Sequence, residues 1–179
     1  MSDADTKPSP QGSPFWRFSL QFYRLPDVAD ACIALQEESG VDVNLLLFLL
    51  WQATRRRKLS SEDVAAIERK IGGWRDATVV PLRAVRRILK SPPGLVAPQS
   101  AEAFRSRIKA VELEAERLQQ EAMYELAQAT AFGQEAPSTE QAARANVRAY
   151  EEMRRVTFPA RAIDAVLSAF TAMGPAPAP

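Results

Sequence analysis

The residues best suited to binding chemistry are the arginines and lysines between Trp51 and Lys90. This segment holds eleven basic and four acidic residues, in a chain whose net charge is only +1. At about 100° per residue, Arg83, Arg87 and Lys90 share one face of a helix. Arg86 lies beside them, and guanidinium groups clustered in this way can bind a phosphate or a carboxylate. The alternative is that these charges are solvated and complement helix C-terminal dipoles.

Four residues of the N-terminal half could line a pocket for a small ligand, such as a phosphorylated or prenyl metabolite. They are Trp16, Cys32, Asn44 and Trp51. Buried polar side chains on helices usually satisfy helix ends or one another. No residue next to Cys32 in the sequence would activate its thiol. Ordinary core packing is therefore the competing interpretation of all four positions.

The sequence contains no histidine. Histidine is the commonest general base and the commonest zinc ligand, so several kinds of active site are excluded together. The chain also lacks a glycine-rich phosphate loop and any spacing typical of metal ligands. We expect no catalytic residues, no metal and no cofactor, and a non-enzymatic role is favoured over an enzymatic one.

The longest predicted element is a helix from about residue 101 to residue 132. Apolar residues recur in alternating steps of four and three, which is the spacing of a coiled-coil seam, and Glu125 is the only misfit. The apolar members are Phe104, Ile108, Val111, Ala115, Leu118, Ala122 and Ala129. Leu113 and Tyr124 fall roughly opposite this seam, so we expect a second contact there, with another helix of the chain or with a partner. Such a seam permits a homodimer without requiring one.

The elements that must position these residues are almost all helices, because strand patterns are scarce. We predict an all-α fold, a bundle of six to eight helices. Residues 15–90 form a compact helical subdomain around an apolar helix beginning at Val43, and residues 98–173 form a long antiparallel hairpin packed on it. In that hairpin, helices at about 139–156 and 160–173 pack on the long helix. Residues 1–14 and 174–179 are predicted to be disordered tails.

Local signals set several helix ends. Asp42 is a predicted N-cap, and Ser60 with Asp63 forms a predicted capping box. Gly72 and Gly73 are expected to stop the helix that follows, and Pro81 either opens a new helix or kinks a continuing one. That segment should bury a stripe of three residues, which are Leu82, Val85 and Leu89.

The compartment is predicted from two features of the chain. A lone cysteine, Cys32, cannot form an internal disulfide and suits a reducing cytosol. The N-terminus lacks the apolar stretch of a signal peptide, and no apolar run approaches the roughly 20 residues needed to cross a bilayer. We therefore expect a cytoplasmic protein with no transmembrane segment.

Three stretches of the sequence resemble an uncharacterised proteobacterial family of conserved hypothetical proteins that contain a domain of unknown function. They are FWRFSLQFYRLPDVADACIALQEESGVDVNLLLFLLW, WRDATVVPLRAVRRILK and IKAVELEAERLQQEAMYEL. The resemblance covers about residues 15–126. It implies a bacterial, cytoplasmic, single-domain protein, and it brings no activity or site residues with it.

The function itself is unknown at this point, and three hypotheses follow. We favour a non-enzymatic interaction or adaptor protein, which binds a protein partner or another anionic ligand through the basic residues and a partner helix through Leu113 and Tyr124. The alternative is a small-ligand protein or enzyme with its pocket between the N-terminal helices. Nucleic-acid binding through the basic segment 55–90 is disfavoured, because no nucleic-acid motif is present.

Overall fold

The computed structural model describes residues 12–92 and 94–174, and helices dominate both stretches. In chain order the elements are α1 (Pro14–Tyr23), α2 (Val28–Ser39), α3 (Val43–Thr54), β1 (Arg57–Lys58), α4 (Ser61–Trp74), η1 (Arg75–Val79), α5 (Val80–Ile88), α6 (Pro98–Ala129), β2 (Gln134–Glu135), α7 (Thr139–Arg154) and α8 (Ala160–Met173). The predicted all-α fold with one long helix is confirmed. Residues 1–11 and 175–179 of the predicted tails lie outside the described residues. Ser13, by contrast, caps α1 through a hydrogen bond from the Trp16 backbone N–H.

The centre of the fold is α3, in which every residue from Asn44 to Ala53 is buried. Asp42 begins the helix as predicted, because its Oδ1 accepts hydrogen bonds from the backbone N–H groups of Asn44 and Leu45. Burying one side chain the size of leucine contributes about 2 kcal/mol. A helix that is apolar on every face must be covered on every side. The helices that do so are α1, α2, α6 and α7.

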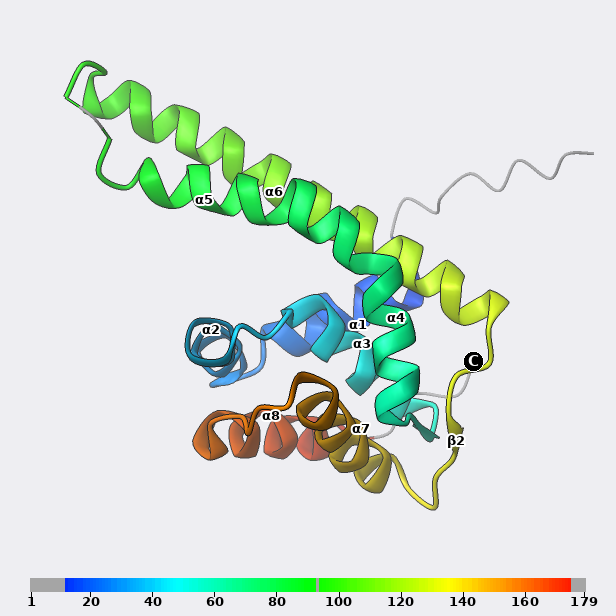
Figure 1. The fold of residues 1–179 in the computed structure, drawn as a ribbon. Helices are drawn as coiled ribbons and strands as arrows, with labels where there is room; N and C mark the ends of the chain where they lie inside the picture. Colours follow the sequence, from blue (N-terminus) through cyan, green and yellow to red (C-terminus); the bar gives the residue numbers. More distant parts are fainter. Residues whose placement is uncertain (1–11, 93, 175–179) are drawn as a thin grey trace, which may run out of the picture.

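The helices after α6 pack differently from the prediction. α7 lies against α3 and α4, and α8 lies against α2, whereas the long helix α6 packs against α1, η1 and α5 (Figure 1). The physical reason is that α3 requires an apolar cover, which α7 supplies through residues such as Ala143 and Val147. The long helix does form an antiparallel hairpin, but its partner is the helix that precedes it.

A continuous helical path connects α4 to α5, and η1 is a π-helical turn within it. The predicted capping box of Ser60 and Asp63 is confirmed at its start. The predicted stop at Gly72 and Gly73 is wrong, since α4 continues through both. Pro81 would collide with the carbonyl of Ala77, four residues earlier, and the wider π turn gives that carbonyl room.

A second correction concerns α5, which contains no buried residue. The predicted stripe of Leu82, Val85 and Leu89 is at most partly covered by α6. We use the term "the arm" for α5 with the facing half of α6, that is, residues 80–92 and 94–118. Figure 1 shows the arm in green, projecting beyond the rest of the fold.

We use the term "the body" for the rest of the described chain, residues 12–79 and 119–174, and two short strands lie in it. Arg57 of β1 pairs with Glu135 of β2, and Lys58 pairs with Gln134, in antiparallel register. Asn146 of α7 is fully buried beneath them. Its amide donates to the carbonyl oxygens of Leu49 and Arg57, and its Oδ1 accepts from the backbone N–H of Leu59 at 2.7 Å. This one side chain therefore fixes the path of the chain as it leaves α3.

Candidate functional site

The predicted basic cluster lies at the seam of the arm. Arg83 Nε donates to Glu112 at 3.1 Å, and Arg83 Nη2 donates to Glu116 at 2.6 Å. Arg86 also binds Glu112, through Nε and through Nη2 at 3.2 Å. Two of the arginines singled out as anion ligands therefore meet carboxylates of α6 in the same chain.

Burial explains the electrostatics of this cluster. Glu112 is only 5% exposed, and although burial opposes its ionisation, hydrogen bonds from Arg86 and Arg83 outweigh that cost and lower its pKa. Burial raises the pKa of Glu116, and its single ion pair with Arg83 only partly compensates. The same carboxylates raise the pKa of Arg86. The cluster is a structural bridge between α5 and α6, with its charges already balanced.

The other two predicted anion ligands are exposed. Arg87 lies 3.4 Å from Glu37 of α2, in an exposed pair. Lys90 is exposed at the end of α5. Earlier in the basic segment, Arg56 pairs with Glu135. Arg75 pairs with three carboxylates, which are Asp42, Glu68 and Asp76. Much of the predicted positive surface is thus engaged within the chain.

The four predicted pocket residues lie at or near the core. Cys32 is fully buried, and burial raises the pKa of its thiol to about 12. Trp51 is buried against three aromatic residues, namely Phe15, Phe48 and Tyr124. Trp16 is half-buried on α1. Asn44 is buried and joins a polar network, so the structure does not bring these four residues together around a cavity that it describes.

The polar network around Asn44 connects α3 to α6. Its side-chain amide donates to Gln119 Oε1 at 3.3 Å, and its Oδ1 accepts from Gln120 Nε2 at 2.7 Å. Gln119 also donates to Asp42 Oδ2 at 3.2 Å. The hydroxyl of Tyr150 accepts a hydrogen bond from the Asp42 backbone N–H at 3.0 Å. The sequence analysis allowed for Asn44 to bond with other buried polar groups, but it did not identify Gln119 and Gln120 as its partners.

The residues predicted to contact a partner helix have different surroundings. Tyr124 packs on Trp51 with ring centroids 5.7 Å apart, so its contact is with the chain's own core. Leu113 is 49% exposed on the arm. The prediction allowed either kind of contact, and the contact of Tyr124 is within the chain.

Only two of the seven residues of the apolar seam predicted for α6 are covered. Ala115 is buried and Ile108 is partly buried. Phe104, Val111 and Leu118, at intervals of seven residues, remain exposed. The covered face of the helix is shifted toward Glu112 and Gln119, which are buried. An apolar stripe therefore runs along the outside of the arm.

The two helices of the arm contribute to a single apolar face. The ion pair of Arg83 with Glu116 marks one edge of the hairpin seam. Val85 follows Arg83 by two residues and Leu118 follows Glu116 by two, a rotation of about 200° in each helix. Both side chains therefore lie at the opposite edge. We call this surface the outer face, and its members are Val85, Ile88, Phe104, Val111 and Leu118, all exposed.

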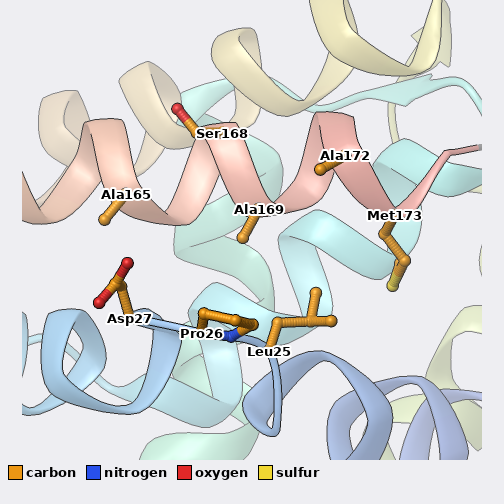
Figure 2. A pocket seen from close by; sticks show the side chains of 8 residues that line it. All are labelled: Leu25, Pro26, Asp27, Ala165, Ser168, Ala169, Ala172 and Met173. Atoms are coloured by element: carbon orange, nitrogen blue, oxygen red, sulfur yellow. The ribbon is translucent and has the colours of Figure 1, made fainter.

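Two cavities lie elsewhere on the described chain. The first, of about 370 Å³, lies between the turn that joins α1 to α2 and the small residues of α8 (Figure 2). Figure 2 shows Asp27 facing Ala165 across it, with Leu25 and Met173 at the other end. The second, of about 460 Å³, is polar and lies between Lys58, Asp63 and Gln134. Neither contains a residue predicted for the site.

Comparison with known proteins adds one finding. Residues 14–123, which include the whole arm, match a protein-family model described as a protein of unknown function (DUF2390). No curated protein and no solved structure matches the chain. Within the described residues, no helix has the length and apolar character required to span a membrane.

Proposed function

Since the chain belongs to DUF2390, a family of proteins of unknown function, its role has to be inferred from its own surface. We propose that it is a non-enzymatic interaction protein of the bacterial cytosol, which binds a protein partner through the outer face of the arm. The lone buried thiol of Cys32 suits a reducing compartment of this kind.

The observation that carries the proposal is the placement of apolar side chains on the arm. Val111 is 52% exposed, and its neighbours in the stripe, Phe104 and Leu118, are similarly exposed. A soluble protein gains nothing from solvating a contiguous apolar face, so such faces mark sites of association. The buried Glu112 also links the two helices of the arm through Arg83 and Arg86, and a preformed surface loses less entropy on binding.

The proposed partner surface is the outer face, and it does not include the arginines of the predicted basic cluster. Arg83 and Arg86 act inside the arm, where they join its helices. Lys90 is exposed just beyond the end of α5 and is not part of the outer face. Leu113 becomes a control position, because it lies on the same helix as Val111 but away from the outer face.

The small-ligand alternative has less support, because the residues predicted for its pocket contribute to core packing instead. A ligand that binds only the folded state must raise the melting temperature. A thermal-shift screen with phosphorylated and prenyl metabolites would therefore reveal such a site, including one in either cavity. A reproducible shift would favour this alternative over the interaction proposal.

Site-specific photo-crosslinking in living cells tests the proposal. A photoreactive amino acid at Val111 should give discrete protein adducts, which mass spectrometry identifies. The control is the same residue at Ile33, which is similarly exposed but lies on α2 in the body. We expect no matching adducts there. Equal adducts at both positions, or none at Val111, would contradict the arm as a binding surface.

A further inference from the structure

The shape of the arm indicates what binds it. Two helices can cover only one side of each other, and α5 accordingly contains no buried residue. Two more helices would complete a four-helix bundle and enclose the outer face. Resting on the proposed function, we infer that the partner is a second copy of this chain, whose arm packs antiparallel on the first.

The spacing of the stripe suits a two-fold axis. Phe104 and Leu118 lie seven residues on either side of Val111. In an antiparallel pair centred on Val111, the two Val111 side chains meet on the axis. Phe104 then packs against Leu118 of the second copy, so each large side chain faces one of similar size. A surface that matches itself in this way forms the isologous contact of a closed dimer.

Charges beside the stripe complement each other in the same arrangement. Arg107 lies over the Phe104 ring at 5.4 Å from its centroid, and Glu114, an exposed carboxylate on the same edge, pairs with Arg117 at 2.7 Å. With the axis at Val111, Arg107 comes within one residue of Glu114 of the second copy. A parallel pair would instead place Arg107 beside Arg107, which is repulsive.

The size of the outer face suits a weak, reversible dimer. Residues 98–118 of α6 are about 30 Å long and about 10 Å wide, and the nine residues of α5 add about 14 Å of a second helix. The face thus offers roughly 440 Å² per copy, or about 900 Å² for the pair, which is in the range of transient interfaces. The segment 1–11 is a poor alternative cover, since Met1 and Ala4 are its only apolar side chains.

The first experiment is sedimentation velocity on the full chain across a range of concentrations. We expect a reversible monomer–dimer equilibrium. V111E should raise the dimer dissociation constant by about tenfold or more, because it buries a charge on the axis. L113E is the matched control, with nearly equal exposure on the same helix, and should leave the equilibrium unchanged. Circular dichroism confirms that both variants fold.

A crosslinking experiment then tests the orientation. F104C mixed with L118C should form an intermolecular disulfide, whereas each variant alone should form little. Cys32 does not interfere, because it is fully buried. R107E and E114R should each weaken the dimer, and the double variant should recover part of the loss.

The outcomes separate this inference from the proposed function. A monomer at every concentration overturns the second-copy inference, and so does a dimer that V111E and L113E affect equally. Disulfides within F104C alone would overturn the antiparallel arrangement. The proposed function survives any of these results if photo-crosslinking at Val111 captures a different protein, and it fails if Val111 captures nothing.

Discussion

Arg83 Nε donates a hydrogen bond to Glu112 across the arm at 3.1 Å, and Arg86 approaches the same carboxylate from the next turn. A buried carboxylate between two guanidinium groups thus joins α5 to α6. Buried ion pairs contribute little net stability when intact, but removing one partner leaves the other charge uncompensated. The arm therefore depends on this carboxylate.

Replacing Glu112 with glutamine should destabilise the protein by about 2 kcal/mol at neutral pH, because Arg83 and Arg86 lose their shared counter-charge. The loss should depend on pH. The pKa of Glu112 is lowered from 4.5 in the folded state. The stability that its carboxylate provides is therefore complete above pH 4.5, and it is lost as the pH falls through the folded pKa. Urea denaturation of both proteins from pH 7 to pH 3 measures this effect.

Glu116 provides a control, because its pKa is shifted in the opposite direction to that of Glu112. Burial raises the pKa of Glu116 above 4.5. The stability that this side chain provides is therefore present at low pH, and it is lost as the pH rises through the folded pKa. Glu116→Gln should therefore cost less than Glu112→Gln at neutral pH, and its relative stability should improve as the pH rises. Parallel pH profiles for the two variants would contradict this account of the cluster.

Asn146→Ala should destabilise the body by about 3 kcal/mol, because the backbone N–H of Leu59 and the carbonyl of Arg57 lose their buried partner. Asn146→Asp keeps the acceptor for Leu59 but cannot donate to the two carbonyls, so it should not restore stability. Chemical denaturation at pH 7 compares the two variants. A loss below about 0.5 kcal/mol in both would show that another group takes over these contacts.

Tyr150→Phe should cost about 1 kcal/mol, because the Asp42 backbone N–H then lacks its acceptor at the start of α3. The ring itself still packs against Phe158, so the core should keep its shape. Thermal unfolding followed by circular dichroism provides the measurement. Phe158→Ala is a useful contrast, since it removes packing and should cost more.

Cys32 should react with a thiol reagent at least about a hundredfold more slowly in the folded chain than in urea, because the reactive thiolate is suppressed and inaccessible. Burial raises the pKa of this thiol to about 12. Labelling followed by absorbance at pH 8 gives both rates. Rapid labelling of the folded protein would show that α2 opens locally.

The sequence predicted the parts of the fold that rest on local chemistry. Asp42 and the box of Ser60 with Asp63 begin their helices as expected, because a cap involves only neighbouring residues. The all-round apolar character of α3 likewise identified the central helix. Such signals are contained within one turn of a helix, so no knowledge of the tertiary structure is required.

The covered face of α6 could not be predicted in the same way. The apolar residues pointed to a seam through Val111 and Leu118, whereas the face that is covered includes Glu112 and Gln119. Those polar residues are buried only because their partners, Arg83 and Asn44, come from distant segments. Periodicity reports where apolar residues lie, and it does not indicate which of them a neighbouring helix will cover.

The π turn at η1, between α4 and α5, has a consequence for how the chain can change in length. A π turn corresponds to one extra residue in an α-helix, and each residue adds about 100° of rotation. Deleting a single residue between Arg75 and Val79 would let this turn become regular α-helix, so Arg83 would keep its place opposite Glu112. A deletion within α5 itself has no wide turn to absorb it, and would rotate the later positions by about 100° and carry Arg86 away from Glu112. The turn at η1 is therefore a place where the chain can change length while the surface of the arm stays the same.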